Sequence, residues 1–313
     1  MRDIALRNDS YIRMGVHMPR ALVGRWENGQ EVGQGLPPYA PIQAHPVDDF
    51  PELPDDWERS TEDTATYVVG LAEGNGMWFD FTQLPKHPTH DVAVRMSVQG
   101  VCALTGMELT SGQMPLHQYR HRCPVHGVAF MGNLFCPQCD HEWLPQNYLA
   151  STAPVRMWID GFWASTGKNR QFLITAEEGR GVAAQLIGGR RTFDLTFAFF
   201  KSKEQKVGDD SDDIGSSSQP DYEVFRGGRG VLRRVTRDLE IGAGALINQC
   251  IGTDPKEIEH WNGQRIGTVK IYYMPADQLA QILAARAQRA ERQGGFLGGN
   301  GLKVGNDGGN KKF

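Results

Sequence analysis

Two short cysteine turns carry the strongest chemical signal in the 313-residue sequence. They read Cys-Pro-Val-His at residues 123–126 and Cys-Pro-Gln-Cys at residues 136–139, with nine residues between them. Proline restricts φ in such a turn, and thiolates and imidazoles are the donors that zinc accepts in a tetrahedral shell. We therefore predict a metal site whose ligands are Cys123, His126, Cys136 and Cys139.

The two turns resemble the knuckles of zinc-ribbon and rubredoxin-like modules, although the first turn lacks their usual second cysteine. The resemblance is confined to this insert. His141 and His121 lie close by and are alternative ligands. Four protein ligands leave no open position for a water molecule, so the zinc ion is expected to stabilise the fold and not to take part in catalysis.

The remaining cysteines and the N-terminus indicate a reducing compartment. Five cysteines are an odd number, and three of them lie in the insert, which favours metal binding over a set of disulfides. Cys102 and Cys250 lie in apolar stretches and are expected to be buried. No secretory leader and no membrane-spanning run is found, so we expect a location in the cytoplasm or inside a virion or other intracellular assembly, with no membrane partner.

A second candidate site is the group His87, His90 and Asp91, which offers two imidazoles and a carboxylate. Such groups can act in acid–base or metal chemistry. However, Pro88 and the apolar stretch that follows Asp91 predict a loop entering a strand, where these side chains more often bind the backbone. The sequence also contains no complete P-loop, zincin, nucleophile-elbow or dinucleotide-binding motif, so an enzyme is possible but not favoured.

A basic stretch makes nucleic acid a further alternative. Residues 224–240 carry five arginines against two acids, all five between Arg226 and Arg237. Against this alternative, the whole chain has a net charge of -4, and residues 203–223 carry seven acids against two lysines just before the arginines. Residues 48–63 carry eight acids, so the basic stretch can instead dock on this segment, or both can be solvated.

Around these groups the sequence predicts an α+β fold with a β-rich body. A composition of 40% hydrophobic and 22% charged residues is that of an ordinary globular protein. Strands are expected between Ala65 and Leu109, in a hairpin formed by residues 156–163 and 171–174, and in the runs 192–200 and 266–274. Helices are expected after Thr175, ending at Gly188, and from Ala276 to Gln293.

These elements divide the chain into five segments. The expected segments are an extended Pro-rich arm (1–62), a β-rich domain (63–202) containing the zinc-knuckle insert (117–148), an acidic linker or loop (203–223), an αβ segment packed on the main body (224–293) and a flexible Gly-rich tail (294–313). Aromatic residues in the arm, among them Tyr11, Trp26 and Trp57, favour docking on a neighbouring surface.

The function that we expect from these features is that of a structural or scaffolding subunit. The aromatic-bearing arm, the closed zinc site and the lack of catalytic motifs favour self-association into a homo-oligomer or polymer, with copies of the chain as its partners. The alternatives are a zinc-containing nucleic-acid-binding protein and an enzyme with an active site near His87, His90 and Asp91.

Overall fold

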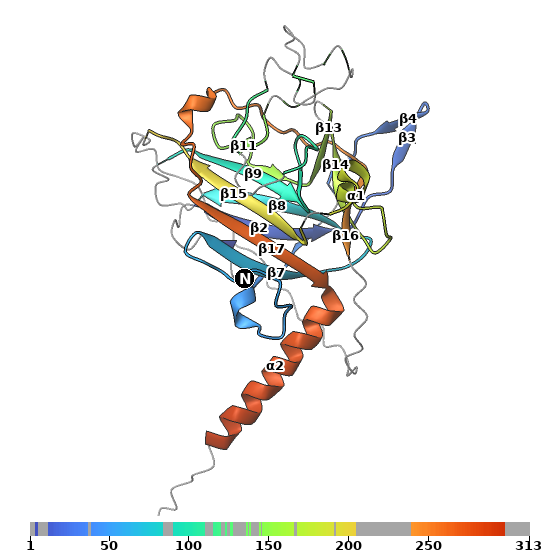
Figure 1. Cartoon of the computed structure of the whole chain (residues 1–313). Coiled ribbons are helices and arrows are strands. Elements are labelled where there is room, and N and C mark those ends of the chain that lie inside the picture. Colours follow the sequence, from blue (N-terminus) through green and yellow to red (C-terminus); the bar gives the residue numbers. More distant parts are fainter. Residues whose placement is uncertain are drawn as a thin grey trace, which may run out of the picture.

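The computed structural model describes residues 4–5, 12–36, 39–83, 90–109, 115–119, 123, 126–127, 136, 138, 144, 146–165, 168–190, 192–204 and 239–297. Within these residues the chain is rich in strands, with some helix, and forms a body of two β-sheets (Figure 1). A β-rich body is therefore confirmed.

The first sheet has eight strands in the described part of the chain. Its centre consists of β2 (Ile12–Pro19), β8 (Gly76–Gln83) and β14 (Lys168–Thr175). Its other strands are β1 (Ile4–Ala5), β5 (Tyr39–Pro41), β12 (Trp158–Ile159), β13 (Gly161–Ser165) and β16 (Glu240–Ile247). Neighbouring strands in this sheet are antiparallel.

The second sheet has seven strands in the described residues. Their order is β10 (Val101–Cys102), β9 (Val92–Val98), β15 (Asp194–Lys201), β17 (Gly267–Pro275), β7 (Thr64–Leu71) and β6 (His45–Pro46), with β11 (Leu149–Ala150) also beside β9. The β17–β7 pair is parallel, and the other pairs are antiparallel.

Aromatic side chains from the inner faces of the two sheets form the core between them. The Phe197 ring lies 4.8 Å from the Phe79 ring and 5.7 Å from the Phe81 ring, measured between centroids. Phe79 and Phe81 lie on β8 of the first sheet, whereas Phe197 lies on β15 of the second. Side chains alternate between the two faces of a strand, so the residues between these positions face outward.

Apolar clusters cover the outer face of the second sheet at both ends. The insert-side cluster consists of Ala93, Leu116, Tyr148, Ala150, Ala198, Phe200 and Trp261. The helix-side cluster consists of Val47, Phe50, Leu53, Val68, Tyr272 and Leu279. The strand register places Arg95, Ser97, Thr268 and Lys270 between the two clusters, so the centre of this outer face is polar.

Several local elements agree with the sequence analysis. The expected hairpin is formed by β13 and β14, and the expected late strands are β15 and β17. The last helix, α2 (Ala276–Leu297), begins after Pro275 as expected but continues past Gln293 through two glycines. Glycine costs only about 1 kcal/mol relative to alanine inside a helix, and it ends a helix mainly when it adopts a left-handed conformation.

The first helix is shorter than expected. α1 (Val182–Ile187) ends at Gly188, which has a φ of 69°, but it begins seven residues after Thr175. Thr175 is instead the last residue of β14, where it pairs with Glu240 of β16. Its hydroxyl accepts a hydrogen bond from the Glu177 amide, so Thr175 stabilises a turn and not a helix start.

The described part of residues 1–62 differs from an extended arm. β2 forms six residue pairs with β8, from Ile12–Gln83 to His17–Trp78. Met14 and Val16 are 1% and 3% exposed and belong to the core between the sheets. Pro19 is the last residue of β2, and Pro41 and Pro46 are the last residues of β5 and β6, so the described prolines do not interrupt β2. Residues 12–19 thus pack on their own chain.

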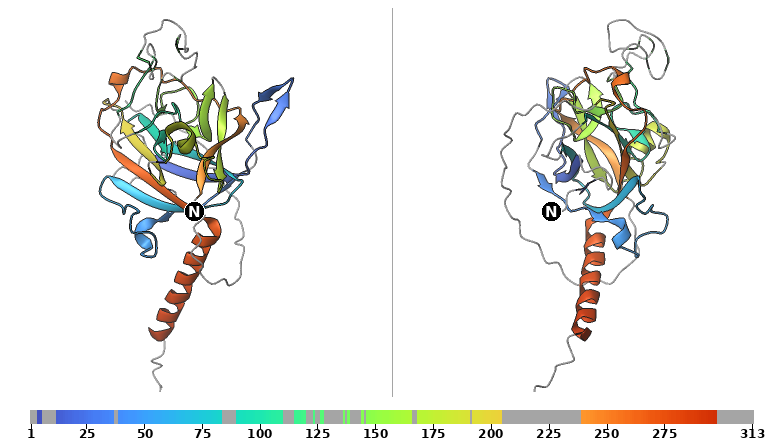
Figure 2. Two further views of the ribbon diagram at one scale, coloured as in Figure 1. Left: turned by 45° about the vertical axis from the view of Figure 1, so that its right-hand side comes forward. Right: turned by 90° about the vertical axis from the view of Figure 1, so that its left-hand side faces the viewer.

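The acidic segment 48–63 contacts the helix-side end of the body. Glu52 pairs with Arg289 of α2 at 2.8 Å, and Glu58 pairs with Lys270 of β17. The Arg286 guanidinium lies 4.8 Å from the centre of the Phe50 ring. Gly70 of β7 allows α2 to approach the sheet, since a Cβ atom there would lie 2.9 Å from the Ala276 Cα atom. The last turns of α2 extend away from the body (Figure 2).

A short hairpin also projects from the body. β3 (Arg25–Glu27) and β4 (Gln30–Val32) form this two-stranded element, and they extend beyond the edge of the first sheet (Figure 2). A turn at Asn28 and Gly29, both with positive φ, joins the two strands. In the described part of the chain, no helix has the length and apolar character required to cross a membrane.

If β2 is an integral part of the core, Val16→Asp will destabilise the protein strongly. The change places an unpaired charge among core side chains and is expected to lower the free energy of unfolding by about 3–5 kcal/mol. Val23→Asp is the matched control, because Val23 is 86% exposed and its replacement should change stability by less than about 0.5 kcal/mol. Urea denaturation followed by circular dichroism measures both. Equal stability of the two variants would contradict this assignment.

Candidate metal centre

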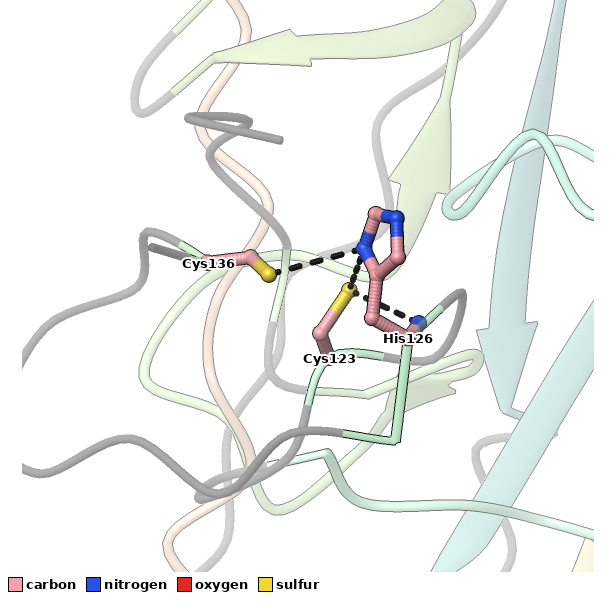
Figure 3. A group of neighbouring side chains, drawn as sticks. All are labelled: Cys123, His126 and Cys136. Atoms are coloured by element: carbon pink, nitrogen blue, oxygen red, sulfur yellow. Dashed lines mark hydrogen bonds between the residues drawn. The ribbon is translucent and has the colours of Figure 1, made fainter. Parts of the chain in front are cut away.

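Cys123, His126 and Cys136 converge on one point in the insert (Figure 3). The Nδ1 atom of His126 lies 3.5 Å from the Cys123 sulfur and 3.6 Å from the Cys136 sulfur. All three ligand atoms lie within 4.8 Å of one another. The structure therefore brings together three of the four residues that the sequence analysis selected, and this group could hold a metal ion.

Backbone amides around the two cysteines point toward the sulfur atoms. The amide of His126 lies 3.4 Å from the Cys123 sulfur, and the amide of Gln138 lies 3.4 Å from the Cys136 sulfur. The first turn is closed by a hydrogen bond from the Gly127 amide to the Cys123 carbonyl oxygen, and Gly127 has a φ of 64°. Amide donors stabilise negative charge on sulfur, which favours the thiolate form that binds metal.

The two sulfur–nitrogen separations fit a tetrahedral zinc shell. With Zn–S bonds of about 2.3 Å and Zn–N bonds of about 2.0–2.1 Å, a sulfur and a nitrogen in a tetrahedral shell lie about 3.6 Å apart. The two observed sulfur–nitrogen distances of 3.5 and 3.6 Å agree with this value. The imidazole nitrogen therefore lies at the distance from both sulfur atoms that a shared zinc ion requires.

The burial of the three side chains is uneven. Cys136 and Cys123 are 0% and 1% exposed and pack against each other, whereas His126 is exposed. The sulfur atoms are therefore shielded from oxidants, and the imidazole forms the solvent side of the group. Cys139 and the alternative ligands His121 and His141 lie outside the described residues, so the fourth ligand stays a prediction.

The two cysteines outside the insert differ from each other. Cys102 is 0% exposed, as expected, and its sulfur lies 3.8 Å from the Asn147 carbonyl oxygen. Cys250 is exposed, so the expectation that it is buried was wrong. The neighbouring Gln249 points inward and donates to the Trp158 carbonyl oxygen. Adjacent residues of an extended chain face opposite sides, and this directs Cys250 outward.

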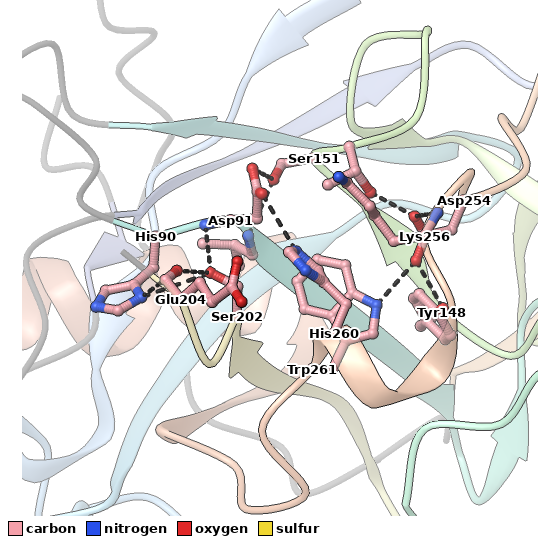
Figure 4. A network of polar contacts seen from close by, with 12 residues as sticks. His90, Asp91, Tyr148, Ser151, Ser202, Glu204, Asp254, Lys256, His260 and Trp261 are labelled. Atoms are coloured by element: carbon pink, nitrogen blue, oxygen red, sulfur yellow. Dashed lines mark hydrogen bonds and ion pairs between the residues drawn. The ribbon is translucent and has the colours of Figure 1, made fainter. Parts of the chain in front are cut away.

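His90 and Asp91 both contact the Ser202 hydroxyl, and each has further polar contacts of its own (Figure 4). His90 Nδ1 lies 3.1 Å from the Glu204 carbonyl oxygen, whereas the Asp91 carboxylate lies 3.3 Å from His260 Nε2 and accepts from the Ser151 hydroxyl. These contacts join the loop before β9 to the loop after β15 and to the turn before β17. His87 lies outside the described residues, so the proposed three-residue site stays untested.

Asp254 is the centre of the neighbouring polar contacts in Figure 4. Its buried carboxylate accepts hydrogen bonds from the Tyr148 hydroxyl and the Trp261 indole, at 2.7 and 2.8 Å, and from the Lys256 amide. Burial and the bond to Asp254 raise the pKa of Tyr148 well above its usual value. Tyr148 and Trp261 belong to the insert-side cluster, so this buried carboxylate orients two of its aromatic side chains.

The charged segments considered in the sequence analysis are mostly outside the described residues. This is true of every arginine from Arg226 to Arg237 and of the chain from 205 to 223.

Neither a protein-family model nor a curated protein nor a solved structure matches this chain. The side chains and their geometry therefore carry the functional assignment.

Sequence reasoning missed a buried carboxyl group at Asp160, between β12 and β13. The residue is 1% exposed, and neither carboxylate oxygen has a hydrogen bond of ordinary geometry. Burial raises the pKa of Asp160 to about 7, although its own amide and the nearby Asn169 side chain oppose part of this rise. No local sequence signal distinguishes this aspartate from an exposed one, because its burial depends on pairing with distant strands.

If Cys123, His126 and Cys136 hold a structural zinc ion, purified protein will contain about one zinc per chain. Cys123→Ser is expected to abolish this zinc content and to lower the melting temperature, because a serine hydroxyl is a poor zinc ligand. Cys250→Ser is the matched control, since it removes an exposed thiol outside the group. Elemental analysis and thermal denaturation measure both effects. Unchanged zinc content in the Cys123 variant would refute the ligand assignment.

Asp160→Asn is expected to reduce the pH dependence of stability. The folded protein holds the Asp160 pKa near 7, above the ordinary value of 3.8, so the unfolded chain loses this proton first as the pH rises. Stability should therefore fall between about pH 4 and pH 7, by up to about 4 kcal/mol for this group, and then level off. Denaturation at pH 5 and pH 8 should show a smaller difference for Asp160→Asn than for wild type or for the exposed-site control Asp277→Asn. An equal change in stability between pH 5 and pH 8 in all three proteins would contradict the raised pKa of Asp160.

Proposed function

We propose that this chain is a structural subunit that assembles with copies of itself, and that zinc in the insert stabilises its fold. In this proposal Cys123, His126 and Cys136 bind the ion together with Cys139. The observation that carries the zinc part is the agreement of the sulfur–nitrogen distances with a tetrahedral shell.

The chemistry of the donor set supports a structural role for the ion. Two sulfur atoms and one imidazole nitrogen suit the borderline-soft Zn²⁺ ion better than Mg²⁺ or Ca²⁺, which prefer oxygen ligands. With a fourth cysteine the shell is closed, so no substrate or water molecule has direct access to the ion. The ion then joins two turns that are nine residues apart in the chain. Among the described residues, their buried apolar cluster consists of the two cysteines alone.

The β3–β4 hairpin supports the self-association part of the proposal. Trp26 near its tip is 66% exposed, and Val23 before it is 86% exposed. The base of the hairpin is held firmly, because Glu31 pairs with Arg170 at 2.9 Å and accepts from the Leu246 amide. A large aromatic side chain on a well-anchored projection is typical of a residue that dominates an interface.

Helix α2 provides a second projecting element. Its first turns are anchored on the body, where Leu279 is 4% exposed, whereas its last turns extend beyond the sheets (Figure 1). An isolated helix end in water gains little stability of its own, because most helix stability in proteins comes from tertiary packing. Contact with a second copy would supply such packing.

A single variant tests the role of the hairpin. If Trp26 anchors contacts between copies, the wild-type protein will show a mass above the 34.8 kDa of one chain, increasing with concentration. Trp26→Ser should weaken this association at least about tenfold, as expected for loss of an interface aromatic. Leu186→Ser is the matched control, because Leu186 is an exposed apolar residue on α1, at 56% exposure.

Sedimentation velocity over a range of concentrations, combined with electron microscopy of the same samples, measures the association. A monomeric wild-type protein at every concentration would contradict self-association. An equal loss of association in the Trp26 and Leu186 variants would contradict the role of the hairpin. Neither result depends on the metal, which is measured separately by elemental analysis.

A further inference from the structure

A polar hollow lies on the outer face of the second sheet, between the insert-side and helix-side clusters. Its volume is about 320 Å³, within the usual range of small-molecule sites. Side chains of β9, β15, β17 and β7 form its floor, and Arg265 and Leu109 contribute to its walls. The site is separate from the metal centre, and its assignment does not depend on the proposed function.

The register of the sheet places the polar groups of the hollow side by side. Arg95 lies opposite Ala198, and Ser97 lies opposite Thr196. On the next strand, Thr268 lies opposite Ala198. The small Ala198 side chain thus lies between Arg95 and Thr268, so the guanidinium and the hydroxyl both border the same space.

Arg95 is a buried cation that has no counter-charge among the described residues. The residue is 4% exposed, and its Nη1 atom has no hydrogen-bond partner. No acidic side chain of the described residues pairs with it. Burial lowers the pKa of the Arg95 guanidinium, with a further lowering by the neighbouring Arg265, whereas Cys102 and Tyr119 act in the opposite direction. Arginine nevertheless stays protonated at neutral pH, so there is a positive charge at this point that no carboxylate of the described residues balances.

A second buried polar group faces the same space. Thr268 is 1% exposed, and its hydroxyl has no hydrogen-bond partner in the described part of the chain. Unpartnered buried polar groups destabilise a fold, and a guanidinium costs more than a hydroxyl. Together, Arg95 and Thr268 border the hollow with two buried polar atoms, Nη1 and Oγ1, that have no hydrogen-bond partner among the described residues.

Charge is distributed unevenly along the hollow. Arg95 and Arg265 lie toward the insert side, whereas Glu58 pairs with Lys270 toward the helix side. The buried Asp194 carboxylate, which accepts from the Thr196 hydroxyl, is near the same helix-side end. An extended polyanion would meet these carboxylates, whereas a single anionic group at the arginine end would not.

We propose that this hollow binds a small molecule through a phosphate group. Arg95 and Arg265 supply the positive charge, and the hydroxyls of Ser97 and Thr268 supply further hydrogen bonds. Arginine is well suited to this role, because its planar fork of donors matches the oxygen atoms of phosphate. The ligand also provides the counter-charge that the described residues do not supply to Arg95.

The test uses the full chain and inorganic phosphate as the probe. Titration calorimetry, with thermal denaturation in parallel, compares phosphate with chloride and acetate at matched ionic strength and pH. Wild type should bind phosphate and melt at a higher temperature in its presence. Arg95→Met should weaken phosphate binding by about tenfold or more, because a charge-assisted bond is lost. Without phosphate, this variant should melt no lower than wild type, because an apolar side chain replaces an unpaired buried charge.

Two further variants complete the test. Arg265→Met removes an exposed lining cation, so it should weaken binding without affecting the fold if Arg95→Met proves insoluble. Arg156→Met is the matched control, because Arg156 is an arginine with a 64% exposed side chain that pairs with Asp80 away from the hollow. It should bind phosphate as wild type does.

Three results would overturn the proposal. The first is no response of wild type to phosphate beyond that to chloride, and the second is an equal response to acetate. The third is a phosphate response that persists in the Arg95 and Arg265 variants. Competition by a single-stranded oligonucleotide at far lower concentration than phosphate would instead identify a polyanion site and refute the small-molecule assignment.

Discussion

The closure of two sheets over a shared aromatic core is the constraint from which the other features of the body follow. Phe79, Phe81 and Phe197 fix which face of β8 and β15 points inward, and the alternation of strand side chains then fixes the opposite face. On the second sheet this outer face receives Arg95 and Thr268 together with apolar residues at both ends. The apolar ends require cover from loops and from α2. The uncovered centre is the polar hollow, so the hollow results from the same register that forms the core.

Local patterns in the sequence were sufficient to predict individual elements but not their partners. Signals within a few positions of each element were enough in three cases. Turn residues mark the β13–β14 hairpin, a run of apolar residues marks β17, and Pro275 marks the start of α2. The position of β2 depends on pairing with β8, which lies more than sixty residues along the chain. The prolines and glycines of residues 1–62 suggested an extended arm, because the composition of a segment does not show which distant strands it pairs with. The same limit applies to Thr175, a good helix cap that tertiary pairing with Glu240 holds at a strand end.

The two candidate sites differ in how far the sequence could reveal them. The metal ligands are close in sequence and have side chains with few structural uses, so the spacing of Cys123, His126 and Cys136 predicted a group that the structure brings together. Arg95 and Asp160 carried no such signal. Their unusual environments result from strands that pair across large sequence separations, and an arginine or aspartate within a strand pattern is most often exposed. Cys250 is the opposite case, a residue that the sequence predicted to be buried and that the structure exposes. Apolar neighbours in the sequence do not determine which way a side chain points.

The insert and the hollow share a structural element, the stem that joins the insert to the body. His117 and Asn147 exchange hydrogen bonds across this stem, and Leu116 anchors it in the insert-side cluster. Burial lowers the pKa of His117, and the positive charge of Arg95 lowers it further, which places the stem beside the arginine end of the hollow. The stem is held by contacts that do not involve the sulfur atoms of Cys123 and Cys136, so the sheet orders the base of the insert. If an ion binds at Cys123 and an anion at Arg95, as we propose, the stem lies between the two sites, and its rigidity would determine whether binding at one site is transmitted to the other.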